Sequence, residues 1–155
     1  MTSCERLIEG AKDAGIRFEL LGEEATRSIV ERVFDIHFPA RDRSGFYKGS
    51  GWVWDSNQDA AVVSFRLFTG QFEEDWAQFE RLMSGWIEGD VYVFFEWRDA
   101  KQSLRFGSIG DLISSLRESP ILDDMYMTDA HSDGLACLNH HDDLILWGEA
   151  IEWVK

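Results

Sequence analysis

Apolar residues recur every three or four positions in several segments of the chain, and this spacing places them on one face of an α-helix. Each of these segments begins with acidic residues or a serine, which helix N-termini favour. Pro39 ends one segment and Pro120 follows another, as expected for a residue that cannot continue a helix. The pattern predicts helices over 4–14, 23–37, 71–84 and 108–119.

Other segments alternate between apolar and polar residues or are rich in β-branched and aromatic side chains, which predicts strands. In 90–98 the alternation places Val91, Val93, Phe95 and Trp97 on one face. The expected strands are 51–56, 60–69, 90–98, 103–106, 124–130, 135–139 and 144–154. Most follow one another across short turns, which favours antiparallel pairing. The sequence therefore predicts an α+β fold in one domain, 1–155: a single antiparallel β-sheet of about six or seven strands with helices packed on one face.

The chain is long and apolar enough to bury a core without a disulfide or metal, since it has 155 residues, 45% of them hydrophobic. Its first residues, MTSCERLIEGAKDAGIRF, are interrupted by charges, which argues against a signal peptide. No apolar run approaches the roughly 20 residues of a membrane span, so the expected location is cytoplasmic. Cys4 and Cys137 are expected to be free thiols, with Cys137 buried in a strand.

Negative charge dominates the composition and is concentrated towards the end of the sequence. The formal net charge is −14, from 29 acidic and 15 basic residues. Residues 107–155 contain only Arg117 and Lys155 as basic residues and carry more than half of this excess. Such a field repels nucleic acid and anionic lipid and attracts basic proteins. The alternative is that the acidic residues only keep the protein soluble.

The densest run of candidate chemical groups is His140, His141, Asp142 and Asp143, within LNHHDDLILWG. Adjacent residues of a strand point to opposite faces, so neighbouring histidines do not converge on one metal ion unless a turn twists them together. Asn139 and the aspartates favour turns, where their side chains bond nearby backbone. The stretch is interpreted first as a hairpin tip, with a functional hydrogen-bond centre, a metal site and an acid–base site as alternatives. Phosphate loops and nucleophile elbows are absent from the sequence, so no cofactor and no catalytic residue is predicted.

The C-terminal third reads DDMYMTDA and then GLACLNHHDDLILWG, and it resembles the closing segment of small acidic bacterial proteins grouped with the immunity proteins of polymorphic toxins. The resemblance implies a non-enzymatic inhibitor whose acidic face covers a basic toxin domain, with no nucleic acid or membrane as partner. Trp147 beside Glu149 would supply an aromatic anchor among acidic residues. The candidate partner-binding residues are Asp123, Asp124, Asp129, Asp133, His140, His141, Asp142, Asp143, Trp147 and Glu149.

Two other function classes stay open at this point. The first is a metal-binding protein or hydrolytic enzyme that uses His140, His141 and Asp142, with His37 or His131 as a further group. The second is a structural or regulatory interaction module, which includes a nucleic-acid mimic. A mimic needs carboxylates in a continuous stripe, whereas the acidic residues here alternate with bulky aromatic ones.

Overall fold

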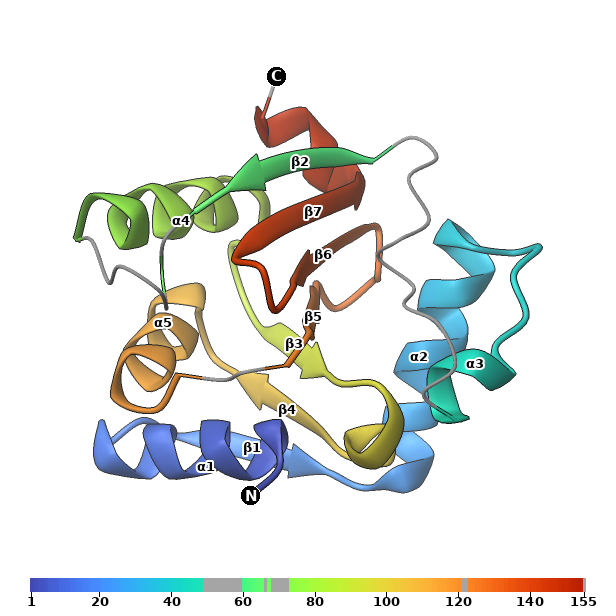
Figure 1. Cartoon of the computed structure of the whole chain (residues 1–155), viewed down its shortest axis with the longest axis horizontal. Coiled ribbons are helices and arrows are strands. Elements are labelled where there is room, and N and C mark those ends of the chain that lie inside the picture. Colours follow the sequence, from blue (N-terminus) through green and yellow to red (C-terminus); the bar gives the residue numbers. More distant parts are fainter. Residues whose placement is uncertain (49–59, 66, 68–72, 121–122, 155) are drawn as a thin grey trace.

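The computed structural model describes residues 1–48, 60–65, 67, 73–120 and 123–154, and the seven strands within these ranges form one antiparallel sheet (Figure 1). The strand order is β1-β4-β3-β5-β6-β7-β2. The predicted α+β class and the single antiparallel sheet are thereby confirmed. The strands are β1 (Phe18–Leu21), β2 (Ala61–Ser64), β3 (Val91–Phe94), β4 (Ser103–Phe106), β5 (Met125–Thr128), β6 (Gly134–Leu138) and β7 (Asp143–Gly148). The strand expected at 51–56 lies outside the described residues.

The described part of the chain also contains α1 (Ser3–Asp13), α2 (Glu23–His37), α3 (Ser44–Lys48), α4 (Glu73–Trp86) and α5 (Ile109–Glu118). The four predicted helices are among them. The first begins one residue early because Thr2, and not Ser3, is its N-cap, with a capping box to Glu5. β1 and α3 were not predicted. No helix in the described ranges is long and apolar enough to cross a bilayer.

Helices cover both faces of the sheet, so the expectation of helices on one face was wrong. α1, α4 and α5 pack on the face that includes Val93 and Met127. α2 and α3 pack on the opposite face, which includes Phe94 and Tyr126. Figure 1 shows the two groups of helices on opposite sides of the strands. β5 and β6 are buried along their whole length, which requires cover on both faces.

The third strand is shorter than the sequence pattern predicts, and this changes the position of Trp97. β3 ends at Phe94, and Trp97–Asp99 form a 3-10 turn, η2, before β4 begins. Trp97 therefore leaves the sheet instead of continuing the face of Val91 and Val93. Its side chain is 53% exposed, and its backbone φ is 57°, in the left-handed region that bulky residues rarely adopt.

The packing of α1 on α5 depends on a glycine. A Cβ atom added at Gly10 would lie 2.2 Å from the backbone oxygen of Ser115, so an alanine there would push the two helices apart. We expect Gly10→Ala to lower the free energy of unfolding by about 1–3 kcal/mol, despite the higher helix propensity of alanine.

The matched control is Gly89→Ala, because a Cβ atom at Gly89 would meet nothing within 4 Å. Urea denaturation of both variants measures the two changes in the free energy of unfolding. Equal stability of Gly10→Ala and the wild type would contradict the close approach of α1 and α5.

Candidate functional site

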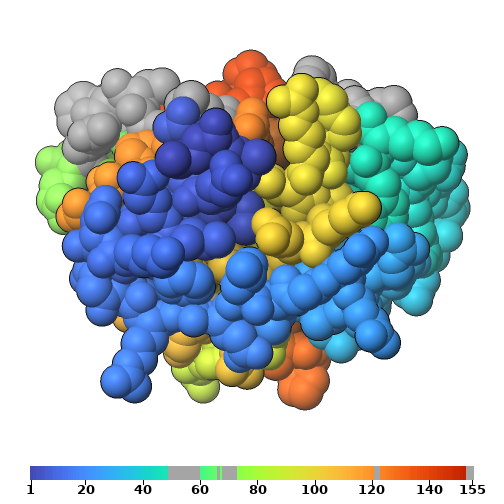
Figure 2. All heavy atoms as spheres, turned by 90° about the horizontal axis from the view of Figure 1, so that it is seen from below, coloured from blue at the N-terminus to red at the C-terminus, as the bar shows by residue number. Residues whose placement is uncertain are grey.

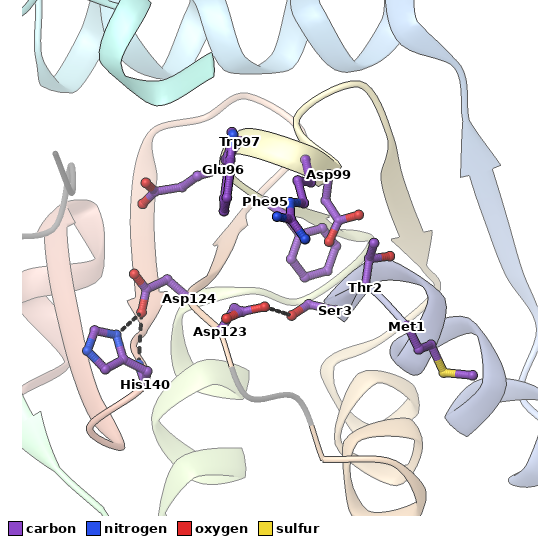
Figure 3. Close-up of a pocket in the computed structure, with 11 residues that line it drawn as sticks. Met1, Thr2, Ser3, Phe95, Glu96, Trp97, Asp99, Asp123, Asp124 and His140 are labelled. Carbon is purple, nitrogen blue, oxygen red and sulfur yellow. Dashed lines mark hydrogen bonds and ion pairs between the residues drawn. The ribbon is translucent and has the colours of Figure 1, made fainter. Parts of the chain in front are cut away.

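A cleft of about 670 Å³ lies beside the N-terminal end of β5. Its walls come from the start of α1, the segment that follows β3, the residues that precede β5, and the turn between β6 and β7 (Figure 3). In Figure 2 the start of α1 and the segment around η2 stand side by side at this part of the surface. The lining residues are Met1, Thr2, Ser3, Phe95, Glu96, Trp97, Arg98, Asp99, Asp123, Asp124 and His140.

Four carboxylates line the cleft, and neutral groups hold two of them at the start of α1. The Ser3 hydroxyl donates to Asp123 over 2.9 Å, and the backbone N–H of Cys4 donates to Asp99 over 3.2 Å. Both carboxylates also benefit from the positive end of the helix dipole. Because these donors are uncharged, they fix the carboxylates without cancelling their negative charge.

A third carboxylate, Glu96, is anchored from within the core. It accepts a hydrogen bond from the hydroxyl of Tyr126, which is buried and stacked on Phe94 with 5.3 Å between ring centroids. Burial raises the pKa of the Tyr126 phenol well above its ordinary value, and the charges of Cys137 and Glu96 act in the same direction. The phenol therefore stays protonated at neutral pH, and its hydrogen bond holds the carboxylate of Glu96 at the edge of the cleft.

The fourth carboxylate, Asp124, is buried and holds the hairpin turn against the start of β5. One of its oxygens accepts from the backbone N–H of His140 at 2.8 Å and from the Nδ1–H of the same residue at 2.9 Å. The ring of His140 packs on that of His141, with 4.0 Å between centroids. An aspartate–histidine pair thus forms one wall of the cleft.

The turn between β6 and β7 is a hairpin tip, as the sequence predicted. The side-chain oxygen of Asn139 accepts from the backbone N–H groups of His141 and Asp143, each at 3.0 Å. Asp142 takes the left-handed backbone conformation with φ 63°, which Asp and Asn tolerate best among non-glycine residues. Turn geometry therefore explains Asn139 and Asp142 in the tip.

Trp97 stands on the rim of the cleft beside the carboxylates (Figure 3). A left-handed backbone costs a bulky residue roughly 1–2 kcal/mol, which the packing of the half-exposed indole has to offset. Strain that is held in this way is frequent at binding sites. The guanidinium carbon of Arg98 lies over the Trp97 ring, 4.3 Å from its centroid.

Nine of the ten candidate partner-binding residues are divided between the two ends of the central strands. Asp123, Asp124, His140, His141, Asp142 and Asp143 lie where β5 begins and β6 turns into β7, and Asp129, Asp133 and Glu149 lie at the other end. The five residue-to-residue steps from Asp124 to Asp129 span about 17 Å of extended chain. The acidic residues of the C-terminal third therefore do not form one surface.

Trp147 and Asp142 were expected to face a partner, and the structure corrects this. Trp147 is only 3% exposed and packs edge-on against Phe38, with 5.4 Å between ring centroids. It points into the α2 face of the sheet because Leu135, Cys137 and Ile145 lie on that face as well. Asp142 is also buried, in the hairpin turn. Neither side chain is available to a partner.

Sequence reasoning missed Glu96, Trp97 and Asp99 as members of the site. They were assigned to a strand and its turn, and only the pairing of β3 with β5 brings them beside Asp123 and Asp124. The available signal was the run WRDAKQ, whose polar residues end the strand earlier than its alternation suggests.

No group of three or more metal-ligating side chains converges within the described residues. His37 and His131 lie with Ser132 and Asp129 at the end of the strands away from His140. Both thiols are free, as predicted; Cys137 is buried in a strand as expected, and Cys4 is buried as well. Burial raises the pKa of Cys4 to about 12, and the charge of Asp99 adds to this, so the thiol is protonated at neutral pH.

Comparisons of the chain with protein-family models, with characterised proteins and with solved structures gave no match. The function is therefore argued from the geometry and charge of the cleft.

Trp97→Gly should leave the stability nearly unchanged, because relief of the left-handed strain offsets the lost packing of a half-exposed indole. We expect a change of less than about 1 kcal/mol in the free energy of unfolding. The comparison variant is Trp147→Ala, which empties a buried position and should cost about 3–5 kcal/mol. Similar losses in both variants, measured by urea denaturation, would show that Trp97 is a structural residue.

His37 should make the protein less stable in mild acid. Its Nε2–H donates to the carbonyl of Ser132 at 2.8 Å. Burial lowers its pKa, although Ser132 and the charges of Asp129 and Asp133 act in the opposite direction. The unfolded chain therefore takes up this proton first as the pH falls below about 6.5, and stability decreases until the folded pKa is passed.

His37→Gln keeps a donor for Ser132 and removes the titration. Thermal melts at pH 7 and pH 5 should show a smaller loss of stability for this variant than for the wild type. An equal loss in both proteins would contradict the lowered pKa.

Proposed function

We propose that the protein is a non-enzymatic binding protein that captures a basic protein partner, and that the cleft receives a basic side chain of this partner. The observation that carries the proposal is the lining of the cleft: four carboxylates and one exposed indole, against the single guanidinium of Arg98 and the imidazole of His140. With His140 neutral, the formal charge of these side chains is negative. A cation is the ligand that such a lining attracts.

The expected energetics match those of an interface hot spot. A cation over an indole contributes about 0.5–2 kcal/mol, depending on its desolvation. A hydrogen bond to a carboxylate contributes about 1.5–3 kcal/mol. One inserted basic side chain that makes both contacts therefore reaches the roughly 2 kcal/mol that defines a hot spot. The net charge of −14 adds long-range attraction and faster association.

The same lining disfavours a hydrolytic role for the Asp124–His140 pair. An acyl-transfer transition state develops negative charge on the substrate oxygen and needs donors or cations directed at it. Here Glu96, Asp99 and Asp123 line the same cleft as the histidine and add negative charge to it. We therefore place the metal-binding and hydrolytic alternatives below the binding proposal.

An immunity-type role is the form of this proposal that fits best. The resemblance of the C-terminal third to such proteins supports it, as does the acidic character of the whole chain. An inhibitor of a basic toxin must bind quickly and tightly, and complementary charge supports rapid association. In this role the cleft would hold one basic residue of the toxin while surrounding surfaces exclude water.

The test is binding to the product of the neighbouring gene, which the proposal expects to be a basic, toxin-like protein, together with rescue of growth on co-expression. Glu96→Gln with Asp123→Asn keeps the acceptors for Tyr126 and Ser3 but removes two charges from the cleft. We expect calorimetry to show a loss of affinity of about tenfold or more for this double variant. Affinity should also fall as the salt concentration rises.

The matched control is Glu24→Gln with Glu118→Gln, which removes two charges from exposed positions outside the cleft. It should retain nearly all of the affinity. An equal loss of affinity in both double variants would show that only the net charge of the protein matters, and this would contradict a role for the cleft. Failure of the neighbouring protein to bind, with no rescue of growth, would contradict the immunity role.

A further inference from the structure

We infer that the cleft is built for the guanidinium of a partner's arginine, and that Arg98 occupies the indole face of Trp97 as an intramolecular stand-in until the partner displaces it. This inference rests on the proposed function and names the group that the cleft receives. Arg98 and Trp97 both line the cleft, and the guanidinium lies over the ring at 4.3 Å from its centroid.

The position of Trp97 favours a planar cation. The residue is 53% exposed on a strained backbone, so a flat group can stack on the ring face that Arg98 covers once Arg98 moves away. Glu96 and Asp99 lie close to it in sequence. Asp123 and Asp124, which precede β5, line the same cleft and are held by Ser3 and His140 (Figure 3). Carboxylates around a stacked cation accept from N–H groups directed outward from its edge.

A guanidinium can stack on the indole and donate to the surrounding carboxylates at the same time, whereas an ammonium group does both poorly. A guanidinium is planar, weakly hydrated and stacks on aromatic rings, while its five N–H donors lie in the plane and form paired bonds with carboxylates. A lysine ammonium is a compact, strongly hydrated point charge. Arg98 and Trp97 already form such a stacked pair of guanidinium and indole within the chain.

Arg98 should therefore compete with the partner. While it covers the indole, an incoming guanidinium must displace it, and its charge offsets part of the negative lining. Removal of Arg98 should strengthen binding of an arginine side chain more than removal of an arginine elsewhere. Arg81 provides the matched position, because it is exposed on α4 and outside the cleft.

The experiment uses N-acetyl-argininamide and N-acetyl-lysinamide as probes, each with a single positive charge. Binding is followed by NMR through the indole N–H of Trp97, assigned by its loss in Trp97→Gly. The wild type should bind the arginine probe at least about threefold more tightly than the lysine probe. Arg98→Gln should raise the affinity for the arginine probe by about three- to tenfold, and Arg81→Gln should leave it unchanged.

A second variant separates stacking from charge. Arg98→Lys keeps the charge but removes the planar group, so it should also raise the affinity for the arginine probe. Equal affinity for the two probes, or no gain in Arg98→Gln over Arg81→Gln, would overturn the inference. Binding of the basic protein and its loss in the double carboxylate variant would still stand in that case, so the two proposals fail separately.

Discussion

Burial of the central strands on both faces is the constraint on which the rest of the structure depends. β5 and β6 have no exposed residue, because helices cover the sheet on either side. A carboxylate within such a strand would lose its hydration without adequate compensation. The charged groups next to β5 and β6 therefore lie beyond the ends of these strands, and the loops at one end enclose the cleft. Because helices cover both faces of the sheet, the cleft lies at the ends of the central strands.

The cleft has four carboxylates in its lining against the single guanidinium of Arg98, so a net negative charge remains. Ser3, the backbone of Cys4 and the phenol of Tyr126 hold carboxylates through neutral donors, so the charges keep their positions and their sign. Trp97 adds an exposed ring in a strained conformation, which folding alone does not favour. Both features cost stability and both suit a cationic ligand, which is why we interpret them together as a binding site.

The sequence predicted the elements that follow one regular period and missed those that depend on tertiary pairing. The helix at 23–37 has the predicted bounds because its apolar stripe is long and Pro39 follows it. β1 has only four residues, and its pairing with the distant β4 gives no local signal. The nearly continuous apolar runs VYVF and MYMT could have indicated cover on both faces. For the site, the acidic excess and the hairpin tip were visible, but Glu96 and Asp99 join it only through the pairing of β3 with β5.

The most direct test of the central claim is a crystal structure of the protein with its basic partner. The account predicts that an arginine side chain of the partner enters the cleft, with its guanidinium on Trp97 and its N–H groups on the surrounding carboxylates. A complex in which the partner covers α2 and α3, or the end of the sheet at Asp129 and Asp133, and leaves the cleft open to solvent would contradict it.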